Sequence, residues 1–395
     1  MKPILIQGAR VVTLDGSTRS DLGVLERADV RINRGRIEAI GTGLDASGCS
    51  VYEARGRVLM PAFVDCHTHA CWAGSRLGEW EQKLRGATYL DLLQAGGGIM
   101  STVRAVRSAS RDELRDLLAF RLDLMLREGT LTAEVKSGYG LTTADEIKML
   151  EAICEAGGSW PGTVVPTACI GHAKDPDEAD PVGRTINETL PAVSQSFPGI
   201  PVDAYCEEGS WTLDETLALM DAALSAGHPV RVHADQFHDL GMIPEAIRRG
   251  FVSVDHLEAT TPEHLSELAS STVYGVMLPM CGLHLDDRYA NGRGFVDDGG
   301  RLAIATNYNP GSAPCLSMPM VIAFGVRKLG LLPGEAIAAS TVWPAELLGF
   351  EDRGRIRVGA RADLVLLHGS DELELAFSFG FSPVACVWCS GRPIR

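Results

Sequence analysis

Two histidines separated by one residue, His67 and His69, follow the apolar run of residues 58–64. In an extended strand, residues i and i+2 point to the same side, so these two imidazoles can reach one point. Neutral imidazole binds zinc, iron and nickel. The pair therefore predicts a metal site, which needs further ligands from elsewhere in the chain to form a catalytic centre with an open position.

The composition limits the classes of protein to which the chain can belong. It has 395 residues, of which 45% are hydrophobic and 22% charged, an ordinary balance for a soluble globular protein. No run approaches the roughly 20 apolar residues of a membrane-spanning helix, so we expect a cytoplasmic protein without a membrane partner. The formal net charge of −15 argues against nucleic acid, which is bound through clustered Lys and Arg. An anionic substrate would need a local positive anchor.

Both ends of the chain show short strand-like segments separated by Gly, Asp and Asn. At the N-terminal end these segments are residues 4–6, 9–14, 28–32 and 36–40, and at the C-terminal end they are 354–359, 362–367 and 384–389. We therefore expect one small β-sandwich domain built from both termini, residues 1–60 plus 345–395, beside a different domain at residues 61–344.

The middle of the chain alternates strand-like apolar runs with helical periodicity, as at residues 111–126, 145–156 and 213–226. The strand candidates are residues 63–65, 130–135, 164–170, 202–206, 230–233, 251–255, 273–277 and 302–305. Because no glycine-rich nucleotide loop follows the first candidate, a (β/α)₈ barrel fits better than an open doubly wound sheet. The predicted fold class is α/β.

Polar side chains stand where the predicted strands end. They are His67, His69, Lys136, His172, Glu207, His233, His256, Asn307 and Asn309. Barrel enzymes build their sites at this end of the strands. A single histidine such as His172 or His256 is more often a hydrogen-bonded structural residue than a ligand. The prediction of a metal-dependent catalytic face therefore depends on the position that the histidines share.

Two other features each allow two interpretations. Lys136 could be a carbamylated metal bridge or a cation that balances Glu134 on the same strand, and we favour the second. The glycine run at residues 96–98 could cradle phosphate, but the Lys-Ser/Thr of a P-loop does not follow it. A loop near the mouth of the site is the better interpretation of these glycines.

Several segments resemble, in the same order, the imidazolonepropionase family of the amidohydrolase superfamily. The superfamily motif is residues 65–69 (DCHTH), with Gly74, Ser75 and Arg76 after it. The segments similar to the family itself are 95–104 (AGGGIMSTVR), 134–141 (EVKSGYGL), 232–236 (VHADQ), 255–258 (DHLE) and 309–312 (NPGS). The resemblance covers nearly the whole chain.

The resemblance implies hydrolysis of 4-imidazolone-5-propanoate to N-formimidoyl-L-glutamate in histidine degradation, with one Zn or Fe ion per chain and a homodimer. His67, His69 and His233 would be metal ligands. His256 would hold or activate the attacking water, and Arg76 would clamp the propanoate carboxylate with its guanidinium. The other pocket residues would be Tyr139, His172, Gln236, Asn309, Gly311 and Ser312, and Gln236 would also lie beside the reacting atoms.

Asn307 departs from the family, which carries an aspartate there that approaches the metal and moves a proton. The amide oxygen of Asn307 could still coordinate a metal weakly, but it offers no carboxylate to accept a proton. Loss of a general base typically costs on the order of 10²- to 10⁴-fold in rate. Three explanations are open. His256, oriented by Asp255 or Glu258, transfers the proton alone; the sequence is an engineered inactive form; or the protein has moved to a related substrate or to binding without turnover.

We favour proton transfer by His256 because every substrate-contact position otherwise matches the family. The alternative enzyme is another amidohydrolase, a deaminase or cyclic-amide hydrolase acting on a different small heterocycle, which would not need Arg76 and Tyr139 together. The alternative outside enzymes is a catalytically silent barrel that binds an imidazolone-like ligand.

Overall fold

Eight parallel strands form the larger of two sheets in the computed structural model, which describes residues 2–16, 21–86 and 97–394. Ala95 and Gly96 of the expected glycine loop lie outside the described residues. The strands stand in the order of the sequence: β6 (Phe63–Asp65), β7 (Thr130–Lys136), β8 (Thr163–Gly171), β9 (Val202–Cys206), β10 (Val230–Ala234), β11 (Ser253–His256), β12 (Tyr274–Met277) and β13 (Arg301–Ile304). All eight lie where the apolar runs predicted them.

The first and last strands of this sheet meet just beyond their carboxyl ends. Thr68 and Tyr308 form an isolated parallel bridge. The amide of Asn307 donates to the carbonyl of His67 at 3.0 Å, and the amide of His69 donates to the carbonyl of Tyr308 at 3.0 Å. The sheet is therefore a nearly closed barrel, which confirms the predicted fold class and brings the segments after β6 and β13 together.

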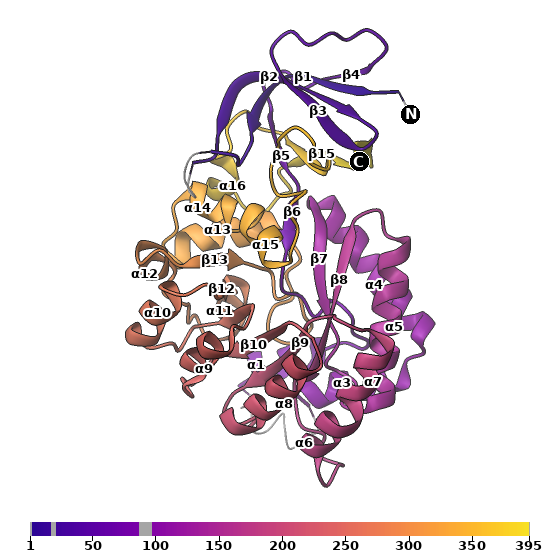
Figure 1. Ribbon diagram of the computed structural model, residues 1–395, viewed down its shortest axis with the longest axis vertical. Helices are drawn as coiled ribbons and strands as arrows, with labels where there is room; N and C mark the ends of the chain where they lie inside the picture. The colour runs from indigo at the N-terminus through magenta and orange to yellow at the C-terminus, as the bar shows by residue number, and fades with distance from the viewer. Residues whose placement is uncertain (1, 17–20, 87–96, 395) are drawn as a thin grey trace.

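Helices connect the strands and cover the barrel (Figure 1). They are α1 (Leu77–Leu84), α3 (Ile99–Ser108), α4 (Arg111–Arg127), α5 (Thr143–Ser159), α6 (Pro181–Arg184), the π-helical turn Thr185–Thr189, α7 (Leu190–Ser196), α8 (Leu213–Ser225), α9 (Met242–Arg249), α10 (Pro262–Ala269), α11 (Pro279–Leu285), α12 (Gly292–Asp297), α13 (Met318–Lys328), α14 (Pro333–Ala338), α15 (Val342–Leu347) and α16 (Glu374–Phe377).

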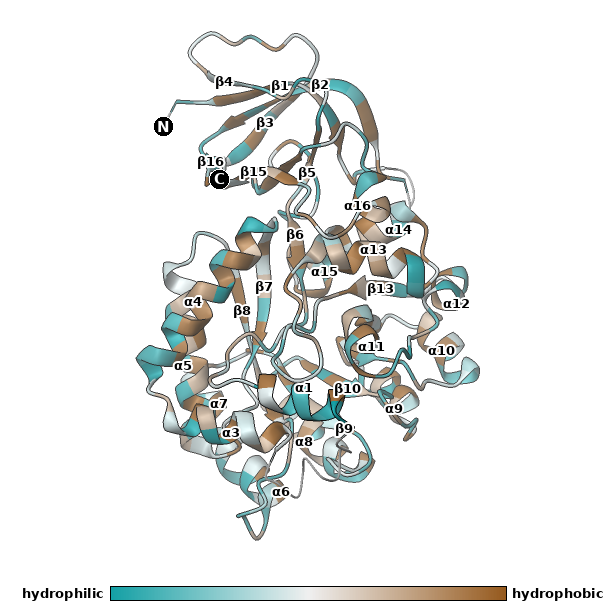
Figure 2. Cartoon of the chain, turned by 180° about the vertical axis from the view of Figure 1, so that it is seen from behind, coloured by the Kyte–Doolittle hydropathy of each residue, from teal (hydrophilic) through white to brown (hydrophobic). Residues whose placement is uncertain are grey.

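The three helices predicted from periodicity are confirmed as α4, α5 and α8, and each begins after a hydroxyl side chain that caps it. Ser110, Thr142 and Thr212 accept hydrogen bonds from backbone amides of the first turn. The outer helices carry both hydrophilic and hydrophobic positions (Figure 2), as expected for helices that cover a barrel. None of the described helices is long and apolar enough to span a membrane.

The second sheet is mixed and takes strands from both ends of the chain. Its strands are β1 (Ile4–Val12), β2 (Val24–Asn33), β3 (Arg36–Gly41), β4 (Ser50–Glu53), β5 (Val58–Pro61), β14 (Leu364–Leu367), β15 (Val384–Cys389) and β16 (Arg392–Pro393). A bridge between Arg36 and Arg361 brings β3 back towards β14, so the sheet folds over a small apolar core of its own. Both chain ends lie in this sheet, and α1, α3 and α6 lie at the opposite end of the barrel (Figure 1).

The prediction of a strand at residues 354–359 is wrong. Gly354 and Gly359 have φ values of 76° and 88°, so the chain turns at both positions instead of extending. Between them, the amide of Ile356 donates to the carbonyl of Thr13 at 2.8 Å. The amide of Gly359 donates to the carbonyl of Ile37 at 2.8 Å, so the segment joins the terminal sheet through separate hydrogen bonds and forms no ladder.

One strand contributes to both cores. Val365 and Leu367 of β14 pack in the barrel core, whereas Leu364 and Leu366 face the small core of the terminal sheet. The alternation follows from the two-residue period of a strand. The division into residues 61–344 and residues 1–60 plus 345–395 stays a prediction, and this shared strand suggests that the two parts are mechanically coupled.

Candidate active site

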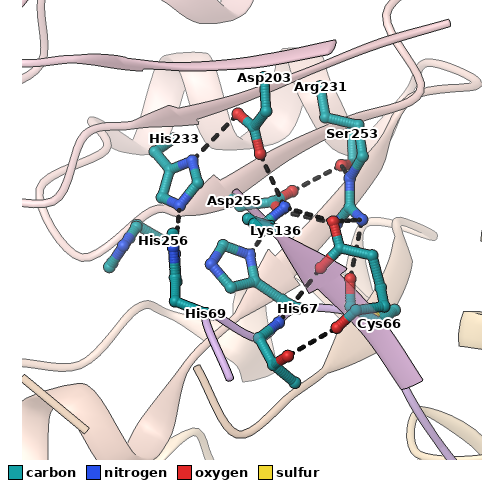
Figure 3. A network of polar contacts seen from close by, with 12 residues as sticks. Cys66, His67, His69, Lys136, Asp203, Arg231, His233, Ser253, Asp255 and His256 are labelled. Carbon is teal, nitrogen blue, oxygen red and sulfur yellow. Dashed lines mark hydrogen bonds and ion pairs between the residues drawn. The ribbon is translucent and has the colours of Figure 1, made fainter. Parts of the chain in front are cut away.

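Three buried histidines converge at the carboxyl ends of the barrel strands. His67 and His69 follow β6, and His233 lies near the end of β10. Each of the three offers a ligand atom within 4.8 Å of the other two. The Nε2 atoms of His69 and His233 face each other at 3.1 Å. The structure thus brings together the three residues that were predicted as metal ligands (Figure 3).

A carboxylate fixes the ring of two of these histidines. Nδ1 of His67 lies 2.6 Å from Oδ2 of Asp255, and Nδ1 of His233 lies 3.0 Å from Oδ1 of Asp203. Because a carboxylate only accepts hydrogen bonds, both Nδ1 atoms carry the proton. Each Nε2 then keeps its lone pair, and this is the tautomer that a metal ligand needs.

Beneath the histidines lies a buried network of charges, also drawn in Figure 3. Nζ of Lys136 is 2.7 Å from Oε1 of Glu134 and 2.7 Å from Oδ2 of Asp203. Nη2 of Arg231 is 2.7 Å from Oδ2 of Asp255. Lys136 therefore balances Glu134, as favoured from the sequence, and it also holds the carboxylate that orients His233.

The surroundings of Lys136 favour a protonated amine. Burial and the nearby Arg231 alone would lower the pKa of Lys136, but the carboxylates of Asp203 and Glu134 outweigh them and raise it. A protonated amine has no lone pair to attack carbon dioxide. The two carboxylate contacts therefore favour the cation interpretation of Lys136 over the carbamylated bridge.

The unpaired atoms of the histidines fit a bound metal ion. Nε2 of His67 and Nδ1 of His69 are buried without a hydrogen-bond partner. Burial, with neighbouring positive and histidine groups, lowers the pKa of both imidazoles well below the usual value, so they are neutral. Buried imidazole nitrogens are what zinc or iron requires, and the three histidines together would leave a coordination position open.

His256, the last residue of β11, stands beside this cluster. Its ring centroid is 5.6 Å from that of His233 and 6.1 Å from that of His67. Nδ1 of His256 lies 3.2 Å from Oε2 of Glu258. Of the two carboxylates proposed from the sequence, Glu258 is thus the one that contacts His256, whereas Asp255 contacts His67. With Nδ1 carrying the proton towards Glu258, Nε2 of His256 is free to accept one.

Asn307 is fixed by its backbone next to the histidine strand. Its amide donates to the carbonyl of His67, and its own carbonyl accepts from Nδ2 of Asn309 at 2.6 Å. Asn307 is 3% exposed and has a φ of 53°, a left-handed conformation that asparagine tolerates. Its role as a metal contact stays a prediction.

Two aromatic rings line the site next to His69. The ring of His172 stacks on that of His69 at 4.7 Å with an interplanar angle of 15°, and the Tyr139 ring lies 5.3 Å from that of His172. Nδ1 of His172 donates to the carbonyl of Gly138 at 2.9 Å. Burial lowers the pKa of His172 to about 4, so the ring is neutral near pH 7.

Gln236 is anchored at both ends of its amide. Its Oε1 accepts a hydrogen bond from the hydroxyl of Tyr205 at 2.8 Å, and its Nε2 donates to Sγ of Cys281 at 3.3 Å. A side chain held in this way has a fixed orientation. Its predicted place beside the reacting atoms is untested.

Arg76 lines a cavity of about 430 Å³ together with Trp72, Gly311 and His284. Its Nη2 is 2.6 Å from Oε2 of Glu79, and the same carboxylate oxygen accepts from the amide of Gly98 at 3.1 Å. A Cβ at Gly311 would lie 3.1 Å from Nη1 of Arg76, so only glycine leaves this side of the guanidinium unobstructed. None of the histidines at positions 67, 69, 172, 233 and 256 borders this cavity.

One segment links the cavity to the histidines. Oδ1 of Asn309 accepts from the amides of Gly311 at 2.8 Å and Ser312 at 2.7 Å, while its Nδ2 donates to the carbonyl of Asn307. Asn309 therefore folds residues 307–312 into a compact turn. The predicted residues divide into a histidine group and an Arg76 group that this turn connects.

Sequence reasoning missed the residues that hold the site residues in place. Asp203 was passed over inside an apolar strand, although a carboxylate there must find a partner once it is buried. Glu146 was passed over inside a helix. Its carboxylate accepts from the amides of Gly138 at 2.9 Å, Gly140 at 2.7 Å and Leu141 at 2.8 Å, which fixes the loop that carries Tyr139. No local pattern distinguishes Glu146 from an exposed helical glutamate.

Comparison with known proteins agrees with this architecture. The model of the amidohydrolase family matches residues 58–394. A mutant of atrazine chlorohydrolase from Arthrobacter aurescens, complexed with zinc and atraton, superposes with a TM-score of 0.71 at 19% identity, over 99% of this chain and 95% of that one. At this identity the likeness is one of fold.

Curated relatives define the group more closely. An imidazolonepropionase of Herpetosiphon aurantiacus is 41% identical, over 97% of this chain and 93% of its own length. One from Deinococcus radiodurans is 39% identical, over 96% of this chain and 95% of its own length. The chain therefore belongs to the amidohydrolase family and, within it, to the imidazolonepropionases.

Proposed function

We propose that the protein hydrolyses 4-imidazolone-5-propanoate to N-formimidoyl-L-glutamate, a step of histidine degradation. Water adds to a ring carbon, a C–N bond breaks, and the leaving nitrogen takes up a proton. The observation that carries the proposal is the group of three buried histidines with His256 beside them, in a chain whose relatives carry this name. The hydrolase character follows from the family.

His67, His69 and His233 would hold one metal ion. When bound, the ion lowers the pKa of a water molecule towards 7 and stabilises the negative charge that develops on oxygen. Imidazole nitrogen suits zinc and iron alike, so we infer one of these two. Elemental analysis of protein purified without added metal identifies which is bound, and less than about half an ion per chain would contradict the site.

His256 is the proposed general base. Oε1 of Glu258, 3.3 Å from Nδ1 of His256, keeps the proton on Nδ1, so Nε2 can take a proton from the attacking water and return it to the leaving nitrogen. The side-chain amide of Asn307 cannot accept and return a proton. His256 therefore performs alone a proton transfer that an aspartate performs in the family pattern.

Arg76 is the proposed anchor for the propanoate carboxylate. Glu79 holds Nη2 of Arg76, and Nη1 makes a long hydrogen bond of 3.4 Å to Oγ1 of Thr102 on the side towards Gly311, where a carboxylate would bind. The negative charge of the protein makes this guanidinium necessary. Tyr139 and His172 would pack against the ring of the substrate, with Gln236, Asn309 and Ser312 as polar contacts.

The test is turnover of 4-imidazolone-5-propanoate by the protein as it stands and by three variants, each with its metal content measured. His256→Ala should lose activity on the order of 10²- to 10⁴-fold while keeping its metal. Asn307→Asp should change turnover by less than about tenfold, equivalent to about 1.4 kcal/mol in the barrier. The matched control is His264→Ala, because His264 lies on α10 outside the histidine group and pairs with Asp239.

Two results would contradict the proposal. If only Asn307→Asp turns the substrate over, His256 does not suffice as the base in this chain. If none of the proteins turns it over although each holds metal, the substrate assignment fails. We also infer a cytoplasmic location from the composition and a homodimer from the resemblance, and mass photometry would reveal a monomer if the second inference is wrong.

A further inference from the structure

A second group of metal-binding side chains lies next to the three histidines. His256, Glu258 and Cys281 each offer one ligand atom, and these atoms all lie within 4.8 Å of one another. We propose that this group is a second, inhibitory zinc site. Its ligands would be Nδ1 of His256, Oε2 of Glu258 and Sγ of Cys281.

The spacing of the first two atoms suits a tetrahedral ion. Ligands at about 2.0–2.1 Å from zinc stand roughly 3.3 Å apart in tetrahedral geometry. Nδ1 of His256 and Oε2 of Glu258 are 3.2 Å apart, and the side chains are only 4% and 5% exposed. These two atoms therefore need little movement to bind one ion.

An unsatisfied oxygen supports the same assignment. Oε2 of Glu258 is buried and accepts no hydrogen bond, because Nδ1 of His256 pairs with the other oxygen, Oε1, at 3.3 Å. A buried carboxylate oxygen without a partner is costly. An ion between His256, Glu258 and Cys281 would satisfy it.

The charges balance when zinc binds. Burial raises the pKa of the Cys281 thiol, so the metal-free group carries the thiol proton. Zinc displaces that proton, and the thiolate and the Glu258 carboxylate then neutralise the two positive charges of the ion. Imidazole, thiolate and carboxylate are all ordinary ligands of zinc.

In another candidate metal-binding group, the ligand atoms already make other contacts. Cys169, Asp203 and His233 also lie within ligand distance of one another. However, one oxygen of Asp203 holds His233 and the other holds Lys136, at 3.0 Å and 2.7 Å. Nε2 of His233 faces His69. Neither residue has a free ligand atom for a second ion.

A small pocket borders the proposed group. It is lined by Gln236, Glu258 and Cys281 on its inner side and by Asp286 and Arg288 on its outer side. The side chains of Asp286 and Arg288 are 37% and 39% exposed and form an ion pair at 2.7 Å.

Inhibition follows from the tautomer of His256, and this step rests on the proposed function. A neutral imidazole carries one proton. If zinc takes Nδ1, the proton must sit on Nε2, which can then only donate. The general base is lost while the first metal site and the substrate pocket remain intact.

Cobalt distinguishes the second site from the first without any activity measurement. Protein that holds zinc at the three-histidine site alone is titrated with Co²⁺. A thiolate-to-cobalt charge-transfer band in the near ultraviolet is recorded. The three-histidine site has no thiol and gives no such band. The wild type should develop the band at about one cobalt per chain, Cys281→Ser should lose it, and Glu258→Gln should need more than about tenfold more cobalt.

Cys169→Ser is the matched control, because Cys169 is the buried thiol of the other candidate metal-binding group. It should keep the band. Absence of a band in the wild type, its persistence in Cys281→Ser, or its loss in Cys169→Ser would each overturn the proposed site.

Zinc titration during turnover tests the inhibition separately. Excess zinc should inhibit the wild type, and Cys281→Ser should need more than about tenfold more zinc for half inhibition. Equal inhibition of both would overturn the inhibitory role. A protein that shows the cobalt band but no turnover at any zinc concentration would contradict the proposed substrate, not the second metal site.

Discussion

At the scale of single residues, the candidate active site depends on which nitrogen of each imidazole carries the proton, and carboxylates determine this. Asp255, Asp203 and Glu258 each face Nδ1 of a different histidine, so that Nε2 of all three is left for chemistry. In an isolated imidazole the two neutral tautomers exchange freely. Here the choice is made before a ligand arrives, which is a form of preorganisation.

Asp255→Asn should weaken metal binding about 10- to 100-fold, because the amide no longer fixes the proton of His67 on Nδ1. Competition with a chromophoric chelator measures this affinity. The matched control is Asp239→Asn, which removes a carboxylate 2.7 Å from Nδ1 of His264 on the surface. Equal affinity in wild type and Asp255→Asn would show that the Asp255 contact does not tune the site.

At the scale of secondary-structure elements, the ends of the strands carry the function and also the unusual backbone. His256 and Leu257 have φ values of 95° and 73°, and Asn307 and Asp235 have values of 53° and 58°. Such conformations cost free energy and persist where the surroundings impose them. At His256 and Asn307 the left-handed backbone occurs in residues that stand at the histidine group.

Asp175 ties together the elements at the same end of the barrel. Its Oδ2 lies 2.7 Å from Arg107 of α3 and 3.2 Å from Arg184 of α6. Burial alone would raise the pKa of Asp175, but hydrogen bonds from Arg107, Asp177 and Arg184 outweigh it and lower the pKa. The folded pKa is thus below the unfolded one, so the stabilisation is present above about pH 4 and is lost as the pH falls through the folded value.

Asp175→Asn should therefore lower the free energy of unfolding by about 1–2 kcal/mol at pH 7 and by less at acid pH. Urea unfolding at pH 7 and near pH 3 measures both. Asp112→Asn is the control, because Asp112 is 66% exposed in its pair with Arg115, and surface pairs contribute little. A loss that does not depend on pH would show that the carboxylate charge is not involved.

The sequence predicted the elements better than the contacts between them. All eight barrel strands, and the histidines after them, followed from apolar runs that end in polar residues. The roles of Asp203 and Glu146 could not be predicted in this way. Asp203 pairs with His233, 30 residues away, and Glu146 accepts hydrogen bonds from backbone amides. The turn at residues 354–359 was mistaken for a strand, since alternating hydrophobicity does not reveal that its glycines have positive φ.

At the scale of the whole molecule, the two sheets share strand β14 and should behave as one cooperative unit. Leu366 faces the small core and its neighbour Leu367 faces the barrel core. Calorimetry should therefore show a single unfolding transition. Leu366→Ala and Leu367→Ala should each lower the stability of that one transition by about 2–5 kcal/mol. Two transitions, with each variant moving only one, would mean that the parts unfold independently.

The placement of β1 and β16 in one sheet has a practical consequence. Both ends of the chain lie on the side of the barrel away from α1, whose residues line the cavity at Arg76. A fusion partner or a solid support attached at either terminus would stand behind the catalytic face. The enzyme should therefore tolerate immobilisation at both ends, with its entrance directed to the solution.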